Sequence, residues 1–278
     1  MKQSILIIMI VLLIQQTLQA QEDFGRYDPN PSKQEASNLR VNVDLGYTQY
    51  LIDVTSTELS RAIDYTLYEA TLGVSYNWGY LNVGLNTKLI LDEDQSNLTL
   101  GSANNPLNDT ADIKRHEFYL YSNYRLSPQF QINLVYRYSN LEASDHYTNF
   151  WEYDTYFKYT TNGLVSSITW VPFYSDHYIL WFNSGLTYTQ TDVEIFENID
   201  GVADDAFIDD SQQALGFKVS AGYTYRYDEH INIRLSGDWY YYDFGKLDVT
   251  SHTIGDTFDK ASLKEQTYSL RLGVSYKF

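Results

Sequence analysis

The last thirteen residues of the chain, QTYSLRLGVSYKF (266–278), carry an apolar or aromatic side chain at every second position. These positions are Tyr268, Leu270, Leu272, Val274, Tyr276 and Phe278. A period of two belongs to a β-strand with one apolar and one polar face. Since the pattern runs to Phe278, we expect this strand to pair with another strand of the same chain.

The same alternation recurs from Leu39 onward and predicts an all-β chain of about ten strands, with eight or twelve as alternatives. The sixth strand changes phase near Asn162-Gly163, which indicates a bulge or a misplaced boundary. The predicted strands lie near 39–48, 68–78, 81–89, 115–126, 130–141, 153–170, 178–190, 213–227, 231–242 and 266–278.

The connections between these strands alternate in length. Short ones are expected at 77–80, 126–129, 171–177 and 227–230, and long ones at 53–64, 92–113, 142–152, 191–212 and 243–264. Such alternation is typical of transmembrane β-barrels, which have short periplasmic turns and long outer loops. The competing fold, a secreted β-sandwich, has strands of about 5–6 residues and no reason to alternate its loops.

The N-terminus carries the one continuously apolar stretch, ILIIMIVLLI (5–14), after Lys2 and before Ala20. An apolar run of this length with a small residue at its end predicts a secretory signal peptide over 1–20. The polar, proline-containing segment 21–38 follows and reads as a flexible lead to a barrel over 39–278. The chain has no Cys, so neither disulfides nor a lipoprotein anchor is expected.

Over 39–278 the sequence resembles the bacterial outer-membrane β-barrels of the porin-like class. The most specific feature is the C-terminal strand that ends in Phe278, with Tyr276 and Val274 before it. The resemblance implies a closed, antiparallel, up-and-down barrel in the outer membrane of a Gram-negative cell, with both termini periplasmic. It also implies recognition of the C-terminal residues by the barrel-assembly machinery, and contact with outer-membrane lipid and lipopolysaccharide.

Aromatic residues cluster toward both ends of the predicted strands, where interfacial girdles are expected. The chain has 27 Tyr, 13 Phe and 5 Trp. Those near the short turns are Tyr76, Trp78, Tyr80, Tyr124, Phe130, Trp170, Phe173, Tyr178, Tyr223, Tyr225, Tyr276 and Phe278, and those near the long loops are Tyr47, Tyr68, Phe118, Tyr136, Tyr138, Phe157, Tyr188, Trp239, Tyr241 and Tyr268.

Charge is divided between the predicted lumen and the predicted loops. The formal charge of −17 excludes nucleic acid as a partner, because phosphate binding needs a basic surface. The polar face of the strands is nevertheless net basic. Its basic members are Arg40, Lys88, Arg125, Arg137, Lys158, Lys218, Arg226, Arg234, Arg271 and Lys277, and its acidic members are Asp44, Glu69, Glu117 and Asp238.

Two hypotheses follow for this basic lumen. In the first, Lys88, Arg137, Lys218, Arg234 and Arg271 line a narrow passive channel that favours anions or other small solutes. In the second, they pair with Asp44, Glu69 and Asp238 and hold a narrow barrel together, since about eight strands leave room only for side chains. The channel is the leading prediction, and a structural barrel or adhesin that acts through acidic loops is the alternative.

Other chemistry has weaker signals. A surface hydrolase resembling the omptins could draw on Asp145-His146, His116-Glu117, His252 or Asp256, but no omptin or other catalytic motif is present. The acidic stretches LDEDQSN (91–97) and DDAFIDDS (204–211) offer oxygen ligands to divalent cations without the spacing of a known calcium loop. We therefore expect no catalytic residues, no cofactor and no built metal site.

Overall fold

The computed structural model of the chain describes residues 38–55, 60–102, 105–109, 112–147, 153–199, 202–248 and 260–278. The predicted signal peptide (1–20) and nearly all of the predicted lead (21–38) lie outside these residues.

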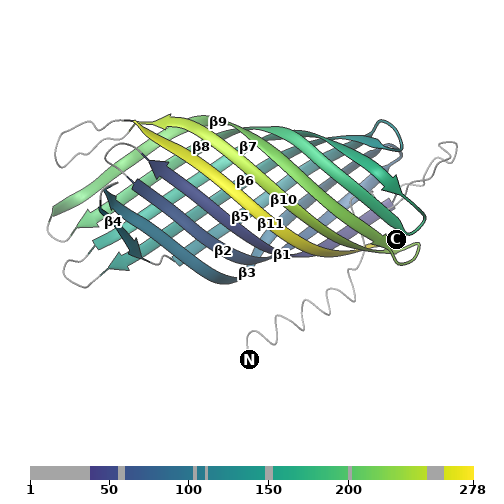
Figure 1. Cartoon of the computed structure of the whole chain (residues 1–278), viewed down its shortest axis with the longest axis horizontal. Helices are drawn as coiled ribbons and strands as arrows, with labels where there is room; N and C mark the ends of the chain where they lie inside the picture. Colours follow the sequence, from purple (N-terminus) through teal and green to yellow (C-terminus); the bar gives the residue numbers. More distant parts are fainter. Residues whose placement is uncertain are drawn as a thin grey trace, which may run out of the picture.

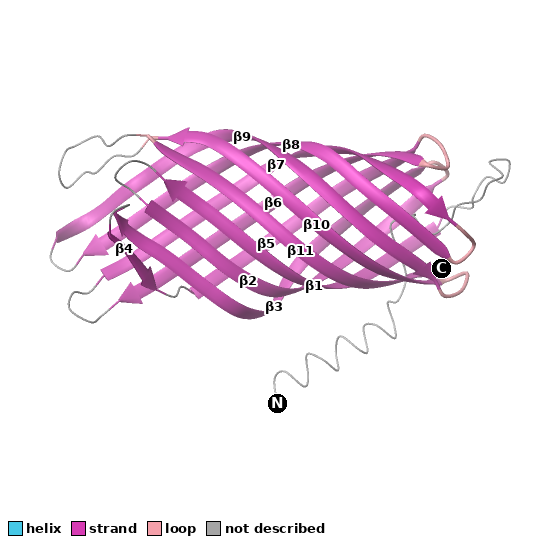
Figure 2. Ribbon diagram, viewed as in Figure 1, coloured by secondary structure: helices cyan, strands magenta, loops and turns pink. Residues whose placement is uncertain are grey.

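Ten antiparallel strands form a closed barrel (Figures 1 and 2). Each strand pairs with its neighbours along the chain, and β1 pairs with β11 from Arg40–Lys277 to Thr55–Ser262, which closes the ring. The barrel strands are β1 (Asn38–Thr55), β2 (Ser60–Trp78), β3 (Leu81–Ser102), β5 (Asp112–Arg125), β6 (Phe130–Tyr147), β7 (Tyr153–Tyr174), β8 (Tyr178–Ile199), β9 (Val202–Arg226), β10 (Ile231–Leu247) and β11 (Ala261–Lys277). The predicted up-and-down barrel is confirmed.

An eleventh strand, β4 (Asn105–Asp109), pairs only with the end of β3 and forms a short hairpin with it. Among the described residues, no helix is long and apolar enough to cross a membrane.

The four short turns lie at the same end of the barrel as the C-terminus (Figure 1). Gly79, between β2 and β3, has a φ of 63°, a backbone conformation that glycine adopts without strain. In the turn between β9 and β10, the Asp228 carboxylate accepts backbone N–H bonds from His230 (2.7 Å) and Ile231 (2.6 Å). These bonds lower the pKa of Asp228. We call this end of the barrel the turn end.

The opposite end is built from long strand extensions. The prediction of long loops at 53–64, 92–113, 142–152, 191–212 and 243–264 is wrong, because most of these residues belong to paired strands. β8 and β9 have 22 and 25 residues and pair as far as Ile199–Val202. Since about 9–11 residues cross a bilayer, roughly half of each such strand projects beyond it.

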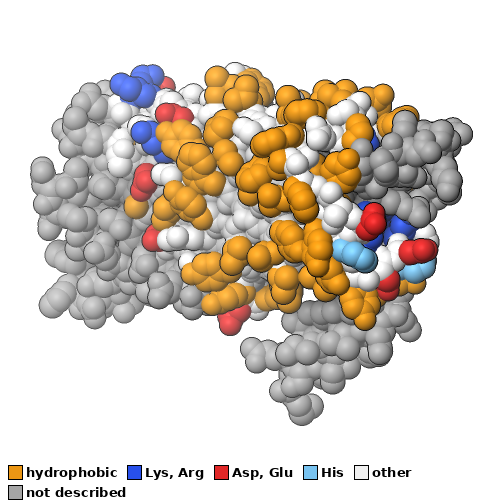
Figure 3. Space-filling view, turned by 45° about the vertical axis from the view of Figure 1, so that its right-hand side comes forward, with side chains coloured by type: hydrophobic (Ala, Val, Ile, Leu, Met, Phe, Trp, Pro, Cys, Tyr) orange, Lys and Arg blue, Asp and Glu red, His pale blue; other side chains and the backbone are white. Residues whose placement is uncertain are grey.

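Exposed apolar side chains form a belt around the half of the barrel next to the turns. In Figure 3 they cover the middle of the visible face. On β1 the belt ends at Tyr47, on β2 it begins at Tyr68, and on β11 it begins at Tyr268. This surface has the composition that hydrocarbon requires, with aromatic residues at both edges.

Beyond the belt, the two faces of each strand exchange character. On β1 the inward side chains change from Asp44 and Thr48 to Tyr50, Ile52 and Val54, which are at most 1% exposed. The outward side chains beyond Tyr47 include Asp53 and Thr55. The barrel is therefore apolar outside and polar inside within the belt, and the reverse beyond it.

This exchange explains the phase change near Asn162-Gly163. The pairing of β7 with β6 continues without a shift through Tyr138–Asn162 and Arg137–Gly163, so no bulge lies there. Inward positions run unbroken from Phe157 to Thr169, but along this stretch the apolar residues move from the inner to the outer face. The irregularity in β7 lies instead between Trp170 and Phe173.

The position of the belt predicts how β1 responds to an outward charge. Leu45→Arg should destabilise the barrel in lipid by about 2–4 kcal/mol, because Leu45 is 52% exposed within the belt and Arg there would face hydrocarbon. Thr55→Arg, on the same face beyond the belt, should change stability by less than about 0.5 kcal/mol. Urea unfolding of both variants in lipid vesicles measures this, and equal losses would contradict the placement of the belt.

Candidate functional site

The interior of the barrel is arranged in layers along its axis. Beyond the belt lies an apolar plug, in which no residue is more than 8% exposed. The plug comprises Tyr50, Ile52, Val54, Ile63, Tyr65, Leu67, Ile113, Leu141, Ala143, Phe157, Tyr159, Val193, Ile195, Ala214, Tyr242, Phe244, Leu247, Ala261 and Leu263. Every barrel strand except β3 contributes a residue to it, and the partly buried Ile90 of β3 packs against it. The plug fills the cross-section with side chains.

A charged layer of three cations and three carboxylates lies directly beneath the plug. It consists of Glu69, Lys88, Arg115, Glu117, Arg137 and Glu265, and no side chain in it is more than 5% exposed. Because the six charges cancel, the layer contributes no net charge to the interior. Buried charges require this compensation, since an unpaired one would lose its hydration without return.

Glu117 on β5 is the centre of this layer. Its Oε1 lies 2.7 Å from Nη2 of Arg115 and 2.8 Å from Nη2 of Arg137, and its Oε2 lies 2.8 Å from Nζ of Lys88. Lys88 also lies 3.2 Å from Glu69 on β2. Arg115 lies 3.0 Å from Glu265 on β11. The network thus crosses the barrel and joins strands that are not neighbours in the sheet.

Four tyrosines connect the charged layer to the plug. Their rings belong to the plug, and their hydroxyls reach the charges. Tyr50 donates to Glu69 (2.8 Å) and Tyr159 donates to Glu265 (2.7 Å). Arg115 donates to Tyr65 (2.5 Å) and Arg137 to Tyr242 (2.6 Å). Tyrosine suits this boundary because it has an apolar ring and a polar tip.

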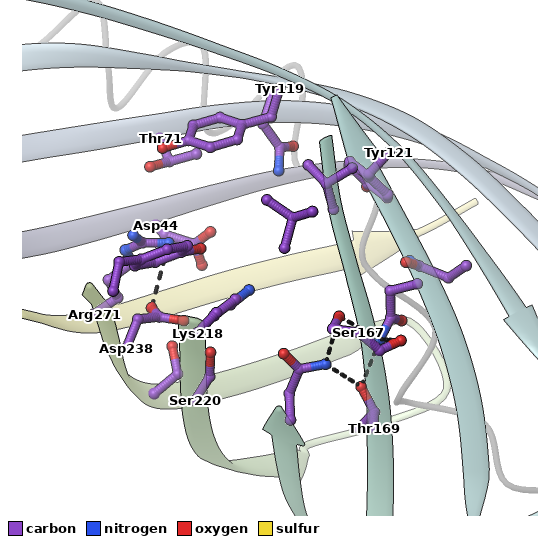
Figure 4. Close-up of a pocket in the computed structure, with 18 of the residues that line it drawn as sticks. Asp44, Thr71, Tyr119, Tyr121, Ser167, Thr169, Lys218, Ser220, Asp238 and Arg271 are labelled. Carbon is purple, nitrogen blue, oxygen red and sulfur yellow. Dashed lines mark hydrogen bonds and ion pairs between the residues drawn. The ribbon is translucent and has the colours of Figure 1, made fainter. Parts of the chain in front are cut away.

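A polar chamber of about 110 Å³ lies between the charged layer and the turn end (Figure 4). Two ion pairs stand in its wall: Arg234 Nη2 lies 2.8 Å from Asp44 and Arg271 Nη1 lies 3.5 Å from Asp238. Lys218 stands beside the second pair, with its Nζ 5.2 Å from the centre of the Tyr240 ring.

Glycine gives the large side chains of the chamber wall their room. A Cβ at Gly222 would lie 2.3 Å from Cζ2 of Trp181, and one at Gly84 would lie 2.3 Å from the Tyr121 hydroxyl. These two inward glycines therefore allow Trp181 and Tyr121 to lie flat against the opposing strands.

All eight residues predicted for the lumen face inward, namely Asp44, Glu69, Lys88, Arg137, Lys218, Arg234, Asp238 and Arg271. Lys88 pairs with Glu69, Arg234 with Asp44 and Arg271 with Asp238, as in the second hypothesis. Arg137 pairs instead with Glu117. Their role in selectivity stays a prediction.

Sequence reasoning misplaced one charge and missed two. Lys158 was expected inside, but it lies on the outward face of β7 and pairs in register with Glu142 and Glu194. Lys158 was placed inside because the apolar residues change phase near Asn162-Gly163, whereas the inward positions of β7 continue there without a shift. Arg115 and Glu265 are inward and buried. Arg115 lies two residues from Glu117, so the alternation contained the signal, whereas Glu265 precedes the predicted start of its strand.

The C-terminal residues close the barrel. Val274 is exposed on the outer face of β11, and Phe278, which follows the last residue of β11, is also exposed. Tyr276 stacks on His230 from the preceding turn, with ring centres 5.2 Å apart. Recognition of these residues by an assembly machinery stays a prediction.

The residues proposed for a hydrolase are not brought together in the described part of the chain. His116 is exposed on the outer face of β5, whereas Glu117 is buried on its inner face. Asp145-His146, His252 and Asp256 lie outside the residues whose side chains are described.

The acidic stretches likewise show no metal site where they are described. No group of three or more His, Asp or Glu among the described residues is placed to hold a metal ion. Asp210, from the second stretch, instead accepts bonds from the backbone of Asp248 (3.0 Å) and the side chain of Gln212 (2.9 Å).

Solved structures share this barrel. The outer membrane protease OmpT from Escherichia coli superposes with a TM-score of 0.60 at 11% identity, over 90% of this chain and 100% of that one. The translocator domain of the autotransporter NalP from Neisseria meningitidis gives a TM-score of 0.50 at 11% identity, over 88% and 90%. The chain has the fold of a bacterial outer-membrane β-barrel.

At these identities the likeness concerns the fold alone. No protein-family model matches the chain, and no curated protein sequence matches it significantly. Function must therefore be argued from the outer-membrane barrel itself.

The charged layer predicts a large effect of neutralising Glu117. Glu117→Gln should destabilise the barrel by about 3–5 kcal/mol, because it leaves three buried cations with two carboxylates. Glu142→Gln, outward on the neighbouring strand, should change stability by less than about 0.5 kcal/mol. Urea unfolding in vesicles compares the two, and a stable Glu117→Gln barrel would contradict the proposed centre of the layer.

Proposed function

We propose that this outer-membrane barrel acts at the cell surface through its projecting outer part, as a surface-binding or structural barrel. The observation that carries the proposal is the filled interior. Residues of the plug such as Tyr50, Leu67 and Leu263 are 0% exposed, so water reaches them from neither end of the barrel. A water-filled pore would leave such lining residues wet.

The outer part has the surface of a water-exposed binding region. Acidic side chains outnumber basic ones on its described outward face. The acidic residues are Asp53, Asp64, Asp92, Asp112, Glu142, Asp192, Glu194, Asp243 and Asp248, and the basic ones are Lys114, Lys158, Lys246, Lys260 and Lys264. We infer a partner that carries positive charge, or a lipopolysaccharide phosphate bridged through a divalent cation.

The orientation in the membrane is part of this proposal. Short turns on one side and long extensions on the other are the usual arrangement of outer-membrane barrels, with the turns in the periplasm. Accordingly, the turn end and both termini face the periplasm, and the plug and the acidic extensions face outside.

The narrow channel remains the competing function. Solute passage would require the plug and the charged layer to move aside, since both cross the whole interior. Lys88 and Arg137 would then lose the carboxylates that now neutralise them.

Orientation can be tested with single cysteines, because the chain has none. Lys114→Cys lies on the outward face of the extension, and Asp176→Cys lies in the turn between β7 and β8. On intact cells, a maleimide attached to a large polyethylene glycol should label Lys114→Cys and leave Asp176→Cys unlabelled. Disrupted cells should label at both positions. Labelling of Asp176→Cys alone on intact cells would contradict the proposed orientation and show that the turn end faces outside.

Surface binding should depend on the acidic extension. Cells that express the protein should attach to a polylysine surface more than cells without it, and less as salt rises, because added salt screens exposed charges. The double variant Asp192→Asn/Glu194→Gln should lower the added attachment about 2-fold or more, at ~0.2–1 kcal/mol for each exposed charge.

A matched control removes the same number of charges from the other end. Asp176→Asn/Glu229→Gln alters two exposed turn residues and should leave attachment unchanged. Equal loss in both double variants, or no loss in the first, would contradict the proposed surface.

A further inference from the structure

We propose that the polar chamber is a binding site for a small neutral polyol, held by amide and hydroxyl groups of β6, β7 and β8. This site is separate from the outer surface considered above. The charged layer and the plug lie between the two.

Four side chains of the chamber wall form a hydrogen-bonded network. Nδ2 of Asn133 donates to Oγ1 of Thr169 (2.9 Å) and to Oγ of Ser167 (3.2 Å). Nδ2 of Asn183 donates to the same two oxygens, at 2.9 Å and 3.0 Å. The dashed lines beside Ser167 and Thr169 in Figure 4 belong to this network. Each hydroxyl oxygen thus accepts two hydrogen bonds, which occupies both of its lone pairs.

The network leaves hydrogen-bonding groups unsatisfied at the chamber. The hydroxyl hydrogens of Ser167 and Thr169 remain to be donated, and no described residue accepts them. Oδ1 of Asn183, a residue only 7% exposed, is buried without a partner. If the Asn183 amide turned over, Oδ1 would accept from the two hydroxyls and Nδ2 would become the unsatisfied group. Either orientation favours a ligand that supplies the missing partners, because a buried polar group without one is destabilising.

These unsatisfied groups indicate a neutral ligand with neighbouring hydroxyls. Two donors and one acceptor side by side match a vicinal diol, in which each hydroxyl both donates and accepts. The arginines of the wall are already paired, Arg234 with Asp44 and Arg271 with Asp238. In Figure 4 Asp44, Asp238 and Arg271 lie on the left of the chamber, away from Ser167 and Thr169 on the right.

Apolar side chains next to the network suit the carbon atoms of such a ligand. Val135, Val165 and Trp181 also line the chamber. The Trp181 ring is held in place because one of its faces lies against Gly222 and it packs with Ile179. A few fixed polar groups among apolar ones are the usual composition of a small-molecule site.

The volume of the chamber limits the size of the ligand. A cavity of about 150 Å³ holds benzene, so 110 Å³ suits a slightly smaller molecule such as glycerol or ethylene glycol.

Access is expected from the turn end. There the interior is closed by polar side chains such as Asn42, Asn77 and Asn82, whereas the other end is closed by the apolar plug. A polyol would pass the polar side chains more readily than the plug. That this side is periplasmic rests on the orientation proposed above, but the site itself does not.

Saturation-transfer NMR of glycerol with the mature protein, folded in a zwitterionic detergent without hydroxyl groups, tests the site. Glycerol should bind saturably. Propane-1,2-diol should bind about 3-fold or more tightly than propane-1,3-diol, whose hydroxyls are not on neighbouring carbons.

Variants of the network give a second test. Thr169→Val and Ser167→Ala should each weaken glycerol binding about 3-fold or more, because each removes one donor. The control Thr187→Val removes a buried hydroxyl of β8 that lies outside the chamber wall, and it should match the wild type. Heat-modifiable gel migration checks the fold of each variant.

Three outcomes would overturn the proposal. They are no saturable glycerol binding, which would leave the chamber to water, equal binding of the two propanediols, and equal effects of the network variants and the control. Because binding is measured in detergent and independently of attachment, its failure would leave the proposed surface function untouched, and the converse also holds.

Discussion

Ring closure between β1 and β11 is the constraint on which the rest of the structure depends. In hydrocarbon, a backbone N–H or C=O without a protein partner costs several kcal/mol, so a sheet with a free edge cannot cross a membrane. The sixteen residue pairs from Arg40–Lys277 to Thr55–Ser262 remove both edges at once. Once the ring is closed, every side chain must face either into the barrel or away from it.

The two faces then take opposite character at two levels of the barrel. Within the belt, lipid requires apolar side chains outside, which leaves polar ones inside. Beyond the belt, water surrounds the wall, and the chain buries its apolar side chains within the ring as a soluble protein would. The charged layer lies at this boundary. Its six charges satisfy one another, and the tyrosine hydroxyls link them to the plug, so neither layer leaves a charge unpaired.

Much of this could be predicted from the sequence, because alternation is a local property of the strand. The barrel, its ten strands, the short turns and the inward positions of Lys88, Arg234 and Asp238 all follow from a period of two. The plug could not be predicted in the same way. Tyr50, Ile52 and Val54 continue the alternation of β1 with the apolar side inward, and a search for apolar outward residues ends at Tyr47. For the same reason, the inward Phe157 and Tyr159 make the alternation of apolar residues in β7 change phase near Asn162-Gly163.

The pairing within the charged layer also could not be predicted from the sequence. Glu117 and Glu265 both contact Arg115, although β5 and β11 are not neighbours in the sheet. Contacts across the barrel depend on its width and on the tilt of the strands, which no single strand records. The sequence supplied inward charges of both signs, and only the closed ring decides which of them meet.

The central claim, that side chains fill the interior, is tested most directly by the conductance of the refolded mature protein in a planar bilayer under a KCl gradient. The plug and the charged layer predict no steady conductance from correctly folded protein. A steady, anion-selective conductance that weakens when Arg137, Arg234 and Arg271 are neutralised together would contradict this account and establish the barrel as a channel.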